Sequence, residues 1–185
     1  MTATVTWLAD DRRASAETRI LDAAARLFLE RGVSQVGMID IAEAAGCSRA
    51  TLYRYFADRT SLYLAYIHRE TRRIAADIST VARRHEDPRE RLLTTVAAAL
   101  CEVRGVPALL AWFRAVDVGT TTELANRSPV IVGITASLLG DATDPDVLER
   151  ARWLVRVVVS LLATPGADPE DERRMLERFV VPLVV

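Results

Sequence analysis

The chain has 185 residues, a length for one or two domains, and half of them are apolar, so a packed core is expected and wholesale disorder is excluded. Its 24 basic residues, all Arg, nearly balance 25 acidic ones, and the formal charge of −1 excludes a highly basic tail protein. Because Arg also occurs on ordinary solvent-facing patterns, we interpret the absence of Lys as coding bias rather than as selection for phosphate binding. Charge is nevertheless segregated: residues 61–85 hold 5 Arg against 2 acids, whereas residues 86–185 hold 11 against 15.

Neither a membrane span nor a secretion signal is evident in the sequence. The longest apolar stretch, Trp153–Ala163, is interrupted by Arg156 and is shorter than the roughly 20 residues that a membrane-spanning helix needs. The N-terminal segment, Met1–Arg13, contains Asp10 and Asp11 and lacks the apolar core of a signal peptide. We therefore expect a cytoplasmic protein that does not contact a membrane.

Cysteine and histidine are too sparse to indicate a metal or catalytic site. Cys47 and Cys101 lie far apart, without a CxxC motif or a nearby histidine. No Ser–His–Asp, Cys–His, paired-carboxylate or HExxH pattern is visible. His68 and His85 lie off the apolar stripe of their helix and are expected to be solvated. The sequence thus predicts no metal, no cofactor and no catalytic residues.

Helical periodicity runs through the chain, and strand patterns are nearly absent. Residues 1–14 are expected to form a loose arm, and Ser15 is expected to cap a first helix that ends at Gly32. Two short helices are predicted next, over Met38–Ala45 and Ser48–Phe56.

Three Asp-Pro pairs mark later helix starts. They stand at positions 87–88, 144–145 and 168–169, and each is followed by an acidic residue within the first turn. Aspartate can accept hydrogen bonds from free amides, proline needs no amide partner at the first helical position, and the acid suits the positive end of the helix. Three helices are therefore expected to begin at these pairs.

The remaining elements complete an all-α prediction of about nine helices. A long fourth helix covers Asp58–Arg84, a break at Gly105–Pro107 precedes a short helix over Ala108–Val116, and a further helix covers Glu123–Leu139. Pro129 lies inside this last segment, so a kink or a later start is expected there.

Residues 38–56 have the spacing of a helix-turn-helix. The tight turn Ala44–Cys47 contains a glycine and joins two short helices. In the second helix Leu52 and Phe56 share one face and indicate a core, in which Ile41 is also expected. The opposite face carries small side chains and arginines, which can approach the major groove and bind guanine.

A longer pattern surrounds this unit, namely IAEAAGCSRATLYRYFADRTSLYLAY over residues 41–66 and ILDAAARLF in the first helix. These segments resemble the TetR family of bacterial transcriptional regulators. The resemblance implies a DNA-binding domain over residues 1–57 and a helical ligand-binding and dimerisation domain over residues 58–185. It also implies a homodimer that binds a palindromic operator in double-stranded DNA, most often as a repressor, and leaves it when a small molecule binds.

The resemblance also assigns the DNA contacts. The first residues of the second short helix would face the bases, its tyrosines would contact phosphate or sugar, and Arg59 would bind a phosphate where relatives usually carry Lys. One departure is that Val36 and Gly37 stand where relatives carry Thr or Ser, so backbone amides alone remain for phosphate there. The expected set is Gly37, Ser48, Arg49, Ala50, Thr51, Tyr53, Arg54, Tyr55 and Arg59.

The middle helices are expected to hold a mostly apolar small-molecule effector. For any one of these residues, plain core packing is the alternative interpretation, and Arg104, Arg114 or Glu70 would bind a polar head group if turned inward. The candidate set is Tyr66, Ile67, Glu70, Leu100, Arg104, Trp112, Phe113, Val116 and Trp153.

The helix over Asp146–Ala163 is apolar on nearly every face from Trp153 onward, and a helix of that kind must be covered on all sides. The last helix, Pro169–Val181, adds further apolar side chains and is followed by an apolar chain end. One small domain cannot readily cover both, so a two-fold dimer through a four-helix bundle is predicted. Its expected contacts are Leu154, Val158, Leu161, Leu162, Met175, Leu176 and Phe179.

Two other functional classes stay open at this point. One is an all-α enzyme, and the other is a partner-recruiting protein whose helix-turn-helix does not regulate transcription. The cluster of arginines from Arg49 to Arg59 argues against partner recruitment as the sole role, and turnover that is lost on mutating pocket residues, without operator binding, would favour the enzyme. Activation rather than repression also stays open.

Overall fold

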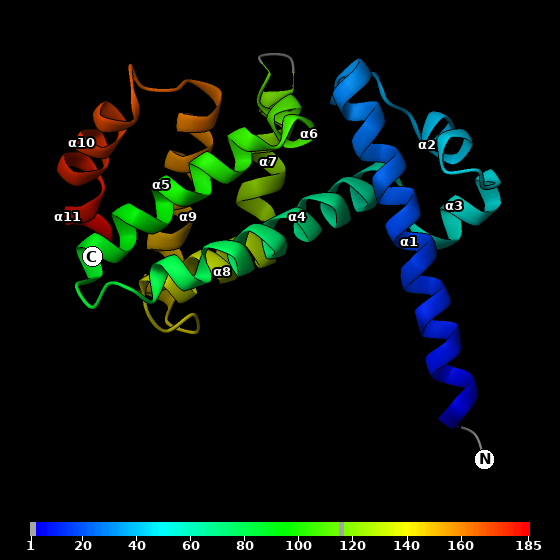
Figure 1. Cartoon of the computed structure of the whole chain (residues 1–185), viewed down its shortest axis with the longest axis horizontal. Coiled ribbons are helices and arrows are strands. Elements are labelled where there is room, and N and C mark those ends of the chain that lie inside the picture. The colour runs from blue at the N-terminus through cyan, green and yellow to red at the C-terminus, as the bar shows by residue number, and fades with distance from the viewer. Residues whose placement is uncertain (1–2, 115–116) are drawn as a thin grey trace. The chain divides into compact units, whose positions relative to one another are not determined.

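The computed structural model describes residues 3–114 and 117–185, and over these residues it is all-α, as predicted. The elements, drawn in Figure 1, are α1 (Ala3–Arg31), η1 (Val33–Gln35), α2 (Met38–Ala44), α3 (Arg49–Tyr55), α4 (Arg59–Ala82), α5 (Pro88–Gly105), α6 (Pro107–Leu110), η2 (Ala111–Phe113), α7 (Val118–Arg127), α8 (Pro129–Leu139), α9 (Pro145–Ala163), α10 (Pro169–Phe179) and α11 (Val181–Val184), where η denotes a 3₁₀ helix.

The first helix is longer than predicted. α1 begins at Ala3 and includes Ser15, so the expected loose arm is helical from that residue onward. Neither proline nor glycine occurs between Ala3 and Arg31, and nothing in the local sequence therefore stops the helix near Ser15. Its end is as predicted: Gly32 has a φ of 82°, and its amide donates to the Phe28 carbonyl at 3.0 Å.

The three Asp-Pro helix starts are confirmed. Asp87 caps α5, Asp144 caps α9 and Asp168 caps α10. Each carboxylate accepts at least one hydrogen bond from a first-turn amide, and the following proline occupies the first helical position.

Two predicted helices are each divided, so the described chain has eleven α-helices rather than about nine. Ser128 ends α7 and caps α8, and its Oγ accepts a hydrogen bond from the Ile131 amide at 3.2 Å. Pro129 has no amide to continue the earlier helix. Near the C-terminus, Pro182 likewise lacks an amide, and Val180 separates α10 from the short α11.

The helices form two compact units, which divide between Tyr66 and Ile67 inside the continuous helix α4. The predicted boundary between residues 57 and 58 therefore differs from the structural one. The physical reason is that the first turns of α4 complete the N-terminal core. The fully buried Phe28 packs edge-to-face on Tyr63 and on Tyr66, with ring centroids 5.4 Å apart in both pairs.

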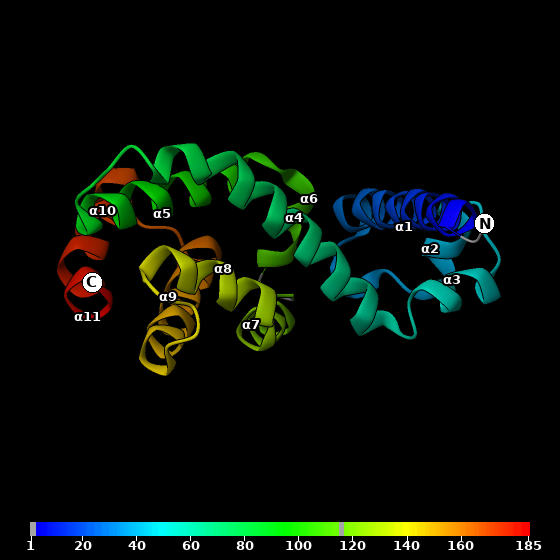
Figure 2. The same cartoon turned by 90° about the horizontal axis from the view of Figure 1, so that it is seen from below.

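In the N-terminal unit, α2 packs on α1 and α3 packs on α2 (Figures 1 and 2). The side chains of Ile41, Leu52 and Phe56 are buried, as the helix-turn-helix pattern predicted. Arg19 adds a polar link, because its Nη2 donates to the Ala45 carbonyl at the end of α2 at 3.2 Å.

In the C-terminal unit, α5 and the adjoining part of α4 face α7, α8 and α9 (Figure 2). One apolar cluster joins α5 and α9 to α10 and α11, with Leu93, Leu154 and Val184 almost fully buried. Smaller clusters join α8 and α7 to α9. The central helix α9 is thus covered within one chain on most of its apolar surface.

Within the described residues, no single helix is long and apolar enough to cross a membrane. One pair of helices meets the length and composition criterion jointly, Pro88–Gly105 with Pro107–Phe113, and it is bent by 94°.

Candidate DNA-binding surface and ligand cavity

The second short helix of the N-terminal unit, α3, has one buried and one exposed face. Ser48 caps it, and its Oγ accepts a hydrogen bond from the Thr51 amide at 3.1 Å. The Thr51 hydroxyl lies 2.9 Å from the same Oγ, so the capping pair occupies both hydroxyls. The face opposite Leu52 is exposed and carries Arg49, Ala50, Tyr53 and Arg54.

The turn before α3 requires a glycine. Gly46 has a φ of 66°, in the left-handed region that side chains with a Cβ disfavour. The Cys47 amide donates to the Ala42 carbonyl at 2.9 Å and closes the turn. The two helices are thereby held at the tight connection typical of a helix-turn-helix.

The start of α2 is less open to phosphate than the sequence predicted. The Gly37 amide donates to the Asp40 carboxylate at 2.8 Å, and Arg31 lies 3.2 Å from the other oxygen of that carboxylate. A phosphate contact through the Gly37 amide would therefore require Asp40 to move.

The Arg59 guanidinium, expected to bind phosphate, makes several bonds within the protein. Its Nη2 donates to the carbonyls of Val33 and Ser34 at 2.9 and 2.8 Å, and its Nε donates to the Tyr63 hydroxyl. The guanidinium also lies over the Tyr63 ring, 5.0 Å from its centroid. Arg59 thus ties α4 to η1. The partly buried Tyr55, another predicted contact, has the Arg54 guanidinium 5.5 Å from its ring centroid.

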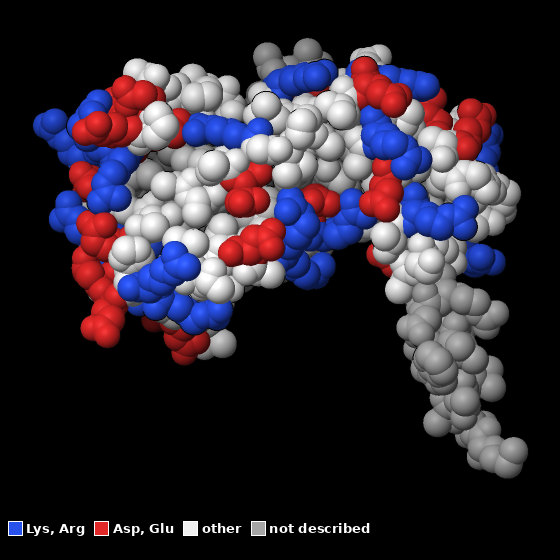
Figure 3. Space-filling view, in the orientation of Figure 1, with Lys and Arg blue, Asp and Glu red and all other residues white. Residues whose placement is uncertain are grey.

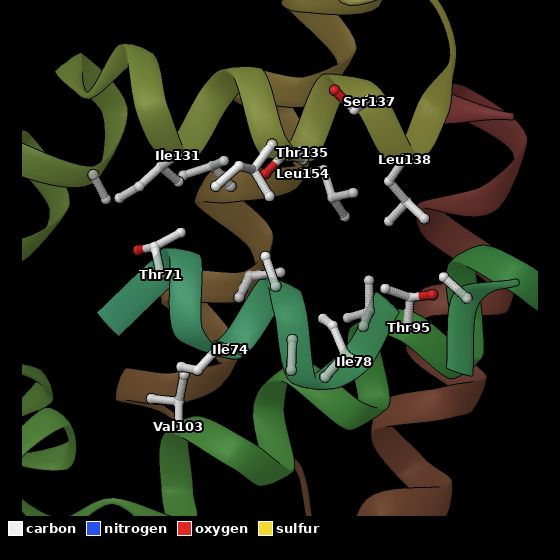
Figure 4. Close-up of a pocket in the computed structure, with 18 of the residues that line it drawn as sticks. Thr71, Ile74, Ile78, Thr95, Val103, Ile131, Thr135, Ser137, Leu138 and Leu154 are labelled. Carbon is white, nitrogen blue, oxygen red and sulfur yellow. The ribbon is translucent and has the colours of Figure 1, made fainter. Parts of the chain in front are cut away.

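The C-terminal unit contains a partly open cavity of about 990 Å³, at the upper end of the range for small-molecule sites. Its wall comes mainly from α4, α5, α8 and α9, with η2 and α7 closing one part. In Figure 4, Ile74 and Ile78 of α4 and Ile131 and Leu138 of α8 line opposite walls. The lining is mostly aliphatic, which suits an apolar ligand.

Residues 20–66, which hold the helix-turn-helix, match the bacterial regulatory proteins of the tetR family. An uncharacterised HTH-type transcriptional regulator of Mycobacterium tuberculosis is 49% identical over 181 residues, which cover 96% of this chain and 90% of the relative. The chain belongs to the TetR family. It is a transcriptional regulator with a DNA-binding helix-turn-helix, and its relatives are regulators rather than enzymes.

Two solved TetR-like structures share the fold. The TetR family repressor AlkX from a Dietzia species, implicated in biodegradation of n-alkanes, aligns with a TM-score of 0.62 at 23% identity over 91% of this chain and 97% of its own. The regulator FadR from Bacillus subtilis, in complex with stearoyl-CoA, aligns with a TM-score of 0.60 at 16% identity over 90% and 97%.

In this TetR-family chain the cavity gathers only part of the predicted effector set. Ile67, Glu70, Trp112 and Phe113 line it. The other described candidates lie elsewhere: Tyr66 in the N-terminal core, Leu100 in the α5–α9 core, Arg104 in an ion pair, and Trp153 on the surface at 45% exposure. Val116 lies outside the described residues. Amphipathic periodicity identifies which helix faces are apolar, but it does not distinguish the faces that line the cavity from those that pack in the core.

The predicted dimer contacts also divide into two groups. Met175 and Phe179 are exposed, at 41% and 61%. The others are covered by the same chain, because α5, α8 and α11 pack around α9 and α10: Leu154, Leu161, Leu162 and Leu176 are buried, and Val158 is partly buried. Contrary to expectation, helices of the same chain thus cover most of these apolar side chains, and only Met175 and Phe179 remain exposed.

Arg104 is turned toward α10 rather than into the cavity. Its two terminal nitrogens donate to the Glu172 carboxylate at 2.9 and 2.6 Å, and Nη2 also donates to the Leu161 carbonyl at 3.0 Å. The Glu172 side chain is 6% exposed. The hydrogen bonds from the Arg104 guanidinium hold the pKa of Glu172 below its ordinary value.

Glu172→Gln is expected to lower the free energy of unfolding by about 2 kcal/mol near pH 7, because a charge-assisted hydrogen bond is lost and Arg104 keeps no carboxylate. A carboxyl with a lowered folded-state pKa stabilises above its unfolded pKa, and that contribution is lost as the pH falls through the folded value. Thermal unfolding at about pH 7 and about pH 3.5 should therefore show a smaller acid-induced loss in the variant than in the wild type.

Glu170→Gln is the matched control, because Glu170 lies on the same helix with its side chain 82% exposed. Its unfolding temperature should follow the wild type at both pH values. An equal acid-induced loss in Glu172→Gln and in the wild type would show that this ion pair does not contribute to the pH dependence.

The sequence did not predict the positions of several polar residues in the C-terminal unit. His68, expected to be solvated, is partly buried, and its Nε2 lies 2.8 Å from the Ser128 Oγ at the junction of α7 and α8. Burial, with Arg72 close by, lowers the pKa of His68. Arg83, Arg91 and Thr95 line the cavity. The four-residue spacing of Arg91 and Thr95 places both on one face of α5, and this spacing is the sequence feature that could have indicated a shared polar site.

Proposed function

We propose that this TetR-family regulator is a ligand-responsive repressor, which binds a palindromic operator as a homodimer and leaves it when a small, mostly apolar molecule enters the cavity. The observation that carries the proposal is the composition of α4. Its first turns contribute Tyr63 and Tyr66 to the core of the DNA-binding unit, and its later turns contribute Ile74 and Ile78 to the cavity wall. A ligand that favours one placement of α4 then biases the DNA-binding unit through its differential affinity for the two states.

The aliphatic lining supports an apolar effector. Two structural neighbours are consistent with that chemistry, since AlkX is implicated in biodegradation of n-alkanes and FadR holds stearoyl-CoA. The exposed apolar side chains Met175 and Phe179, one turn apart on α10, support a homodimer, because neighbouring large apolar side chains at a surface are typical of an interface.

The direct test is selection of bound fragments from random-sequence DNA by the purified full-length protein. We expect enrichment of an inverted repeat whose half-site centres lie about 10 base pairs, or a multiple of that, apart on the duplex. Release of the enriched duplex by a cavity ligand would support effector control. Absence of any enriched sequence would contradict operator binding, and a lone half-site would contradict the two-fold arrangement.

Arg49→Ala and Arg59→Ala are expected to weaken operator binding in different ways. Arg49 lies on the exposed face of α3, so its loss should change the base preference at one position and cost about 1–3 kcal/mol on the preferred operator. Arg59→Ala should weaken binding to all sequences similarly. If Arg59 contacts a phosphate, the slope of log K against log salt should also become shallower by about one.

Arg26→Ala is the matched control, since Arg26 is exposed on α1 of the same unit and should leave both preference and salt slope unchanged. A weakened Arg59 variant with the wild-type salt slope would indicate that Arg59 acts by holding η1 through Val33 and Ser34. Wild-type binding by both variants would refute the assigned DNA surface.

A further inference from the structure

The polarity of the cavity changes along α5. Arg91, Thr95, Ala99 and Val103 line it at four-residue intervals, so one face of this helix passes from cationic through hydroxyl-bearing and small to apolar. The change is directional, since the charged residue lies near the start of α5 and the apolar residue near its end.

The cavity-lining residues of the neighbouring helix α4 change in polarity in the reverse sequence order, from apolar residues within the helix to a cationic residue just after its end. Ile74 and Ile78 line the body of the cavity, and Arg83 lines it just beyond the end of α4. The connection from α4 to α5 adds the partly buried His85 and the exposed Glu86 to this end. Two arginines, the exposed Arg83 and the partly buried Arg91, and one carboxylate residue, Glu86, thus line the end of the cavity at the α4–α5 connection, which gives that end a positive balance.

Neither of these two arginines is neutralised within the part of the chain that the structure describes. The Arg83 side chain donates to the Ser79 hydroxyl at 3.3 Å, and no carboxylate lies within ion-pair distance of Arg83 or of Arg91. The other cavity carboxylate, Glu70, differs in this respect, because Arg69 and Arg73 lie 2.9 and 3.1 Å from its oxygens. An anion is thus favoured at the α4–α5 end and not beside Glu70.

Thr95 supplies a second, independent indication. Its side chain lines the cavity, the residue is 7% exposed, and its Oγ1 makes no hydrogen bond in the structure. A buried hydroxyl without a partner is costly. Because Oγ1 itself has less than 1 Å² of accessible surface, a ligand oxygen one turn from Arg91 would become its partner only after the Thr95 side chain rotates about χ1 toward the cavity. Figure 4 shows Thr95 near Ile78 and Leu138, at the opposite end of the cavity from Thr71 and Ile131.

We propose that the cavity takes an amphipathic anion whose oxyanion head lies between Arg91, Arg83 and the Thr95 hydroxyl and whose apolar tail runs along Ile78 and Ile74. The inference rests on the proposed role of this cavity as the effector site. Carboxylate and phosphate heads share the required chemistry, since both accept several charge-assisted hydrogen bonds. The tail would occupy the aliphatic body of the cavity, where its burial supplies most of the affinity.

The test is isothermal titration of the full-length protein with probes of one tail length, each below its micelle concentration. Dodecanoate and dodecyl phosphate separate the two head groups, and dodecanol and dodecyltrimethylammonium are the neutral and cationic controls. We expect at least one anionic probe to bind about tenfold or more tightly than dodecanol, and the cation to bind most weakly. Equal or tighter binding of dodecanol would overturn the inference.

Variants locate the head group. Arg91→Ala and Thr95→Val should each weaken the anionic probe by about tenfold and leave dodecanol unchanged. The matched controls are Arg89→Ala and Thr94→Val, since both positions lie on α5 outside the cavity wall. Thr95→Val is isosteric and removes a buried unpartnered hydroxyl, so it should not lower the unfolding temperature. Unchanged anion affinity in both cavity variants would overturn the placement.

A second measurement separates this inference from the proposed function. Each probe is added to the complex of the protein with its selected operator, and release is followed by fluorescence anisotropy. If dodecanoate binds as expected but releases no DNA, the anion site stands and effector control fails. If dodecanol binds as tightly as dodecanoate and releases the DNA to the same extent, effector control stands and the anion site fails.

Discussion

Phe28→Ala is expected to lower the free energy of unfolding of the N-terminal unit by about 3–5 kcal/mol, because a fully buried aromatic side chain is lost and a cavity remains. The two edge-to-face contacts with Tyr63 and Tyr66 are lost with it. These tyrosines lie on the first turns of α4, so the change should loosen the packing of α4 on α1. Operator affinity should fall in parallel, since few molecules then retain the folded α3.

Hydrogen exchange followed by mass spectrometry measures this effect locally. Peptides from residues 20–66 should exchange faster in Phe28→Ala, whereas peptides from α9 and α10 should exchange as in the wild type. Leu29→Ala is the matched control, because Leu29 is the next residue and is 45% exposed, and it should change stability by less than about 0.5 kcal/mol. Similar exchange in the two variants would show that Phe28 does not hold this core together.

The double substitution Met175→Glu, Phe179→Glu is expected to convert the proposed dimer to a monomer and to weaken operator binding by about a hundredfold or more, since the second half-site is then no longer bound intramolecularly. Both side chains are exposed on α10, the helix before the short C-terminal α11. Two carboxylates placed there would be desolvated at an apolar interface without partners. Light scattering measures the mass, and a titration of the selected operator measures the affinity.

Leu110→Glu is the matched control, because Leu110 is also an exposed large apolar side chain of the C-terminal unit, at 41%, but lies on α6. It should leave the mass and the operator affinity unchanged. A dimer that survives the double substitution would refute this interface. A monomer that binds the full operator as tightly as the wild type would refute the need for a dimer.

The helix-turn-helix could be predicted from the sequence because its signals are local. The cap at Ser48, the glycine in the turn and the spacing of Leu52 and Phe56 each depend on residues within one or two helical turns. The Asp-Pro pairs have the same property, since an aspartate and a proline act on the first turn that follows them. These elements lie where the sequence placed them.

The start of α1 and the end of the N-terminal unit could not be predicted in the same way. Ser15 is a good N-capping residue, yet it lies inside a longer helix, because a serine acts as a cap only where the helix begins and the residues before Ser15 are themselves helical. The unit extends to Tyr66 because the buried Phe28 needs both tyrosines of α4 as neighbours, and that contact spans residues far apart in the chain.

The all-Arg composition and the positive balance of residues 61–85 are properties of the sequence. On the folded chain, arginines and acidic residues lie interspersed over the face shown in Figure 3. The sequence by itself determined the fold class, the helix-turn-helix and the family. Only the tertiary structure decided that Arg104 pairs with Glu172, that Arg59 holds η1, and that Thr95 lines a cavity. The physical reason is that periodicity identifies the face of a helix that is buried, whereas the partner on that face, whether side chain, backbone or void, is set by helices distant in sequence.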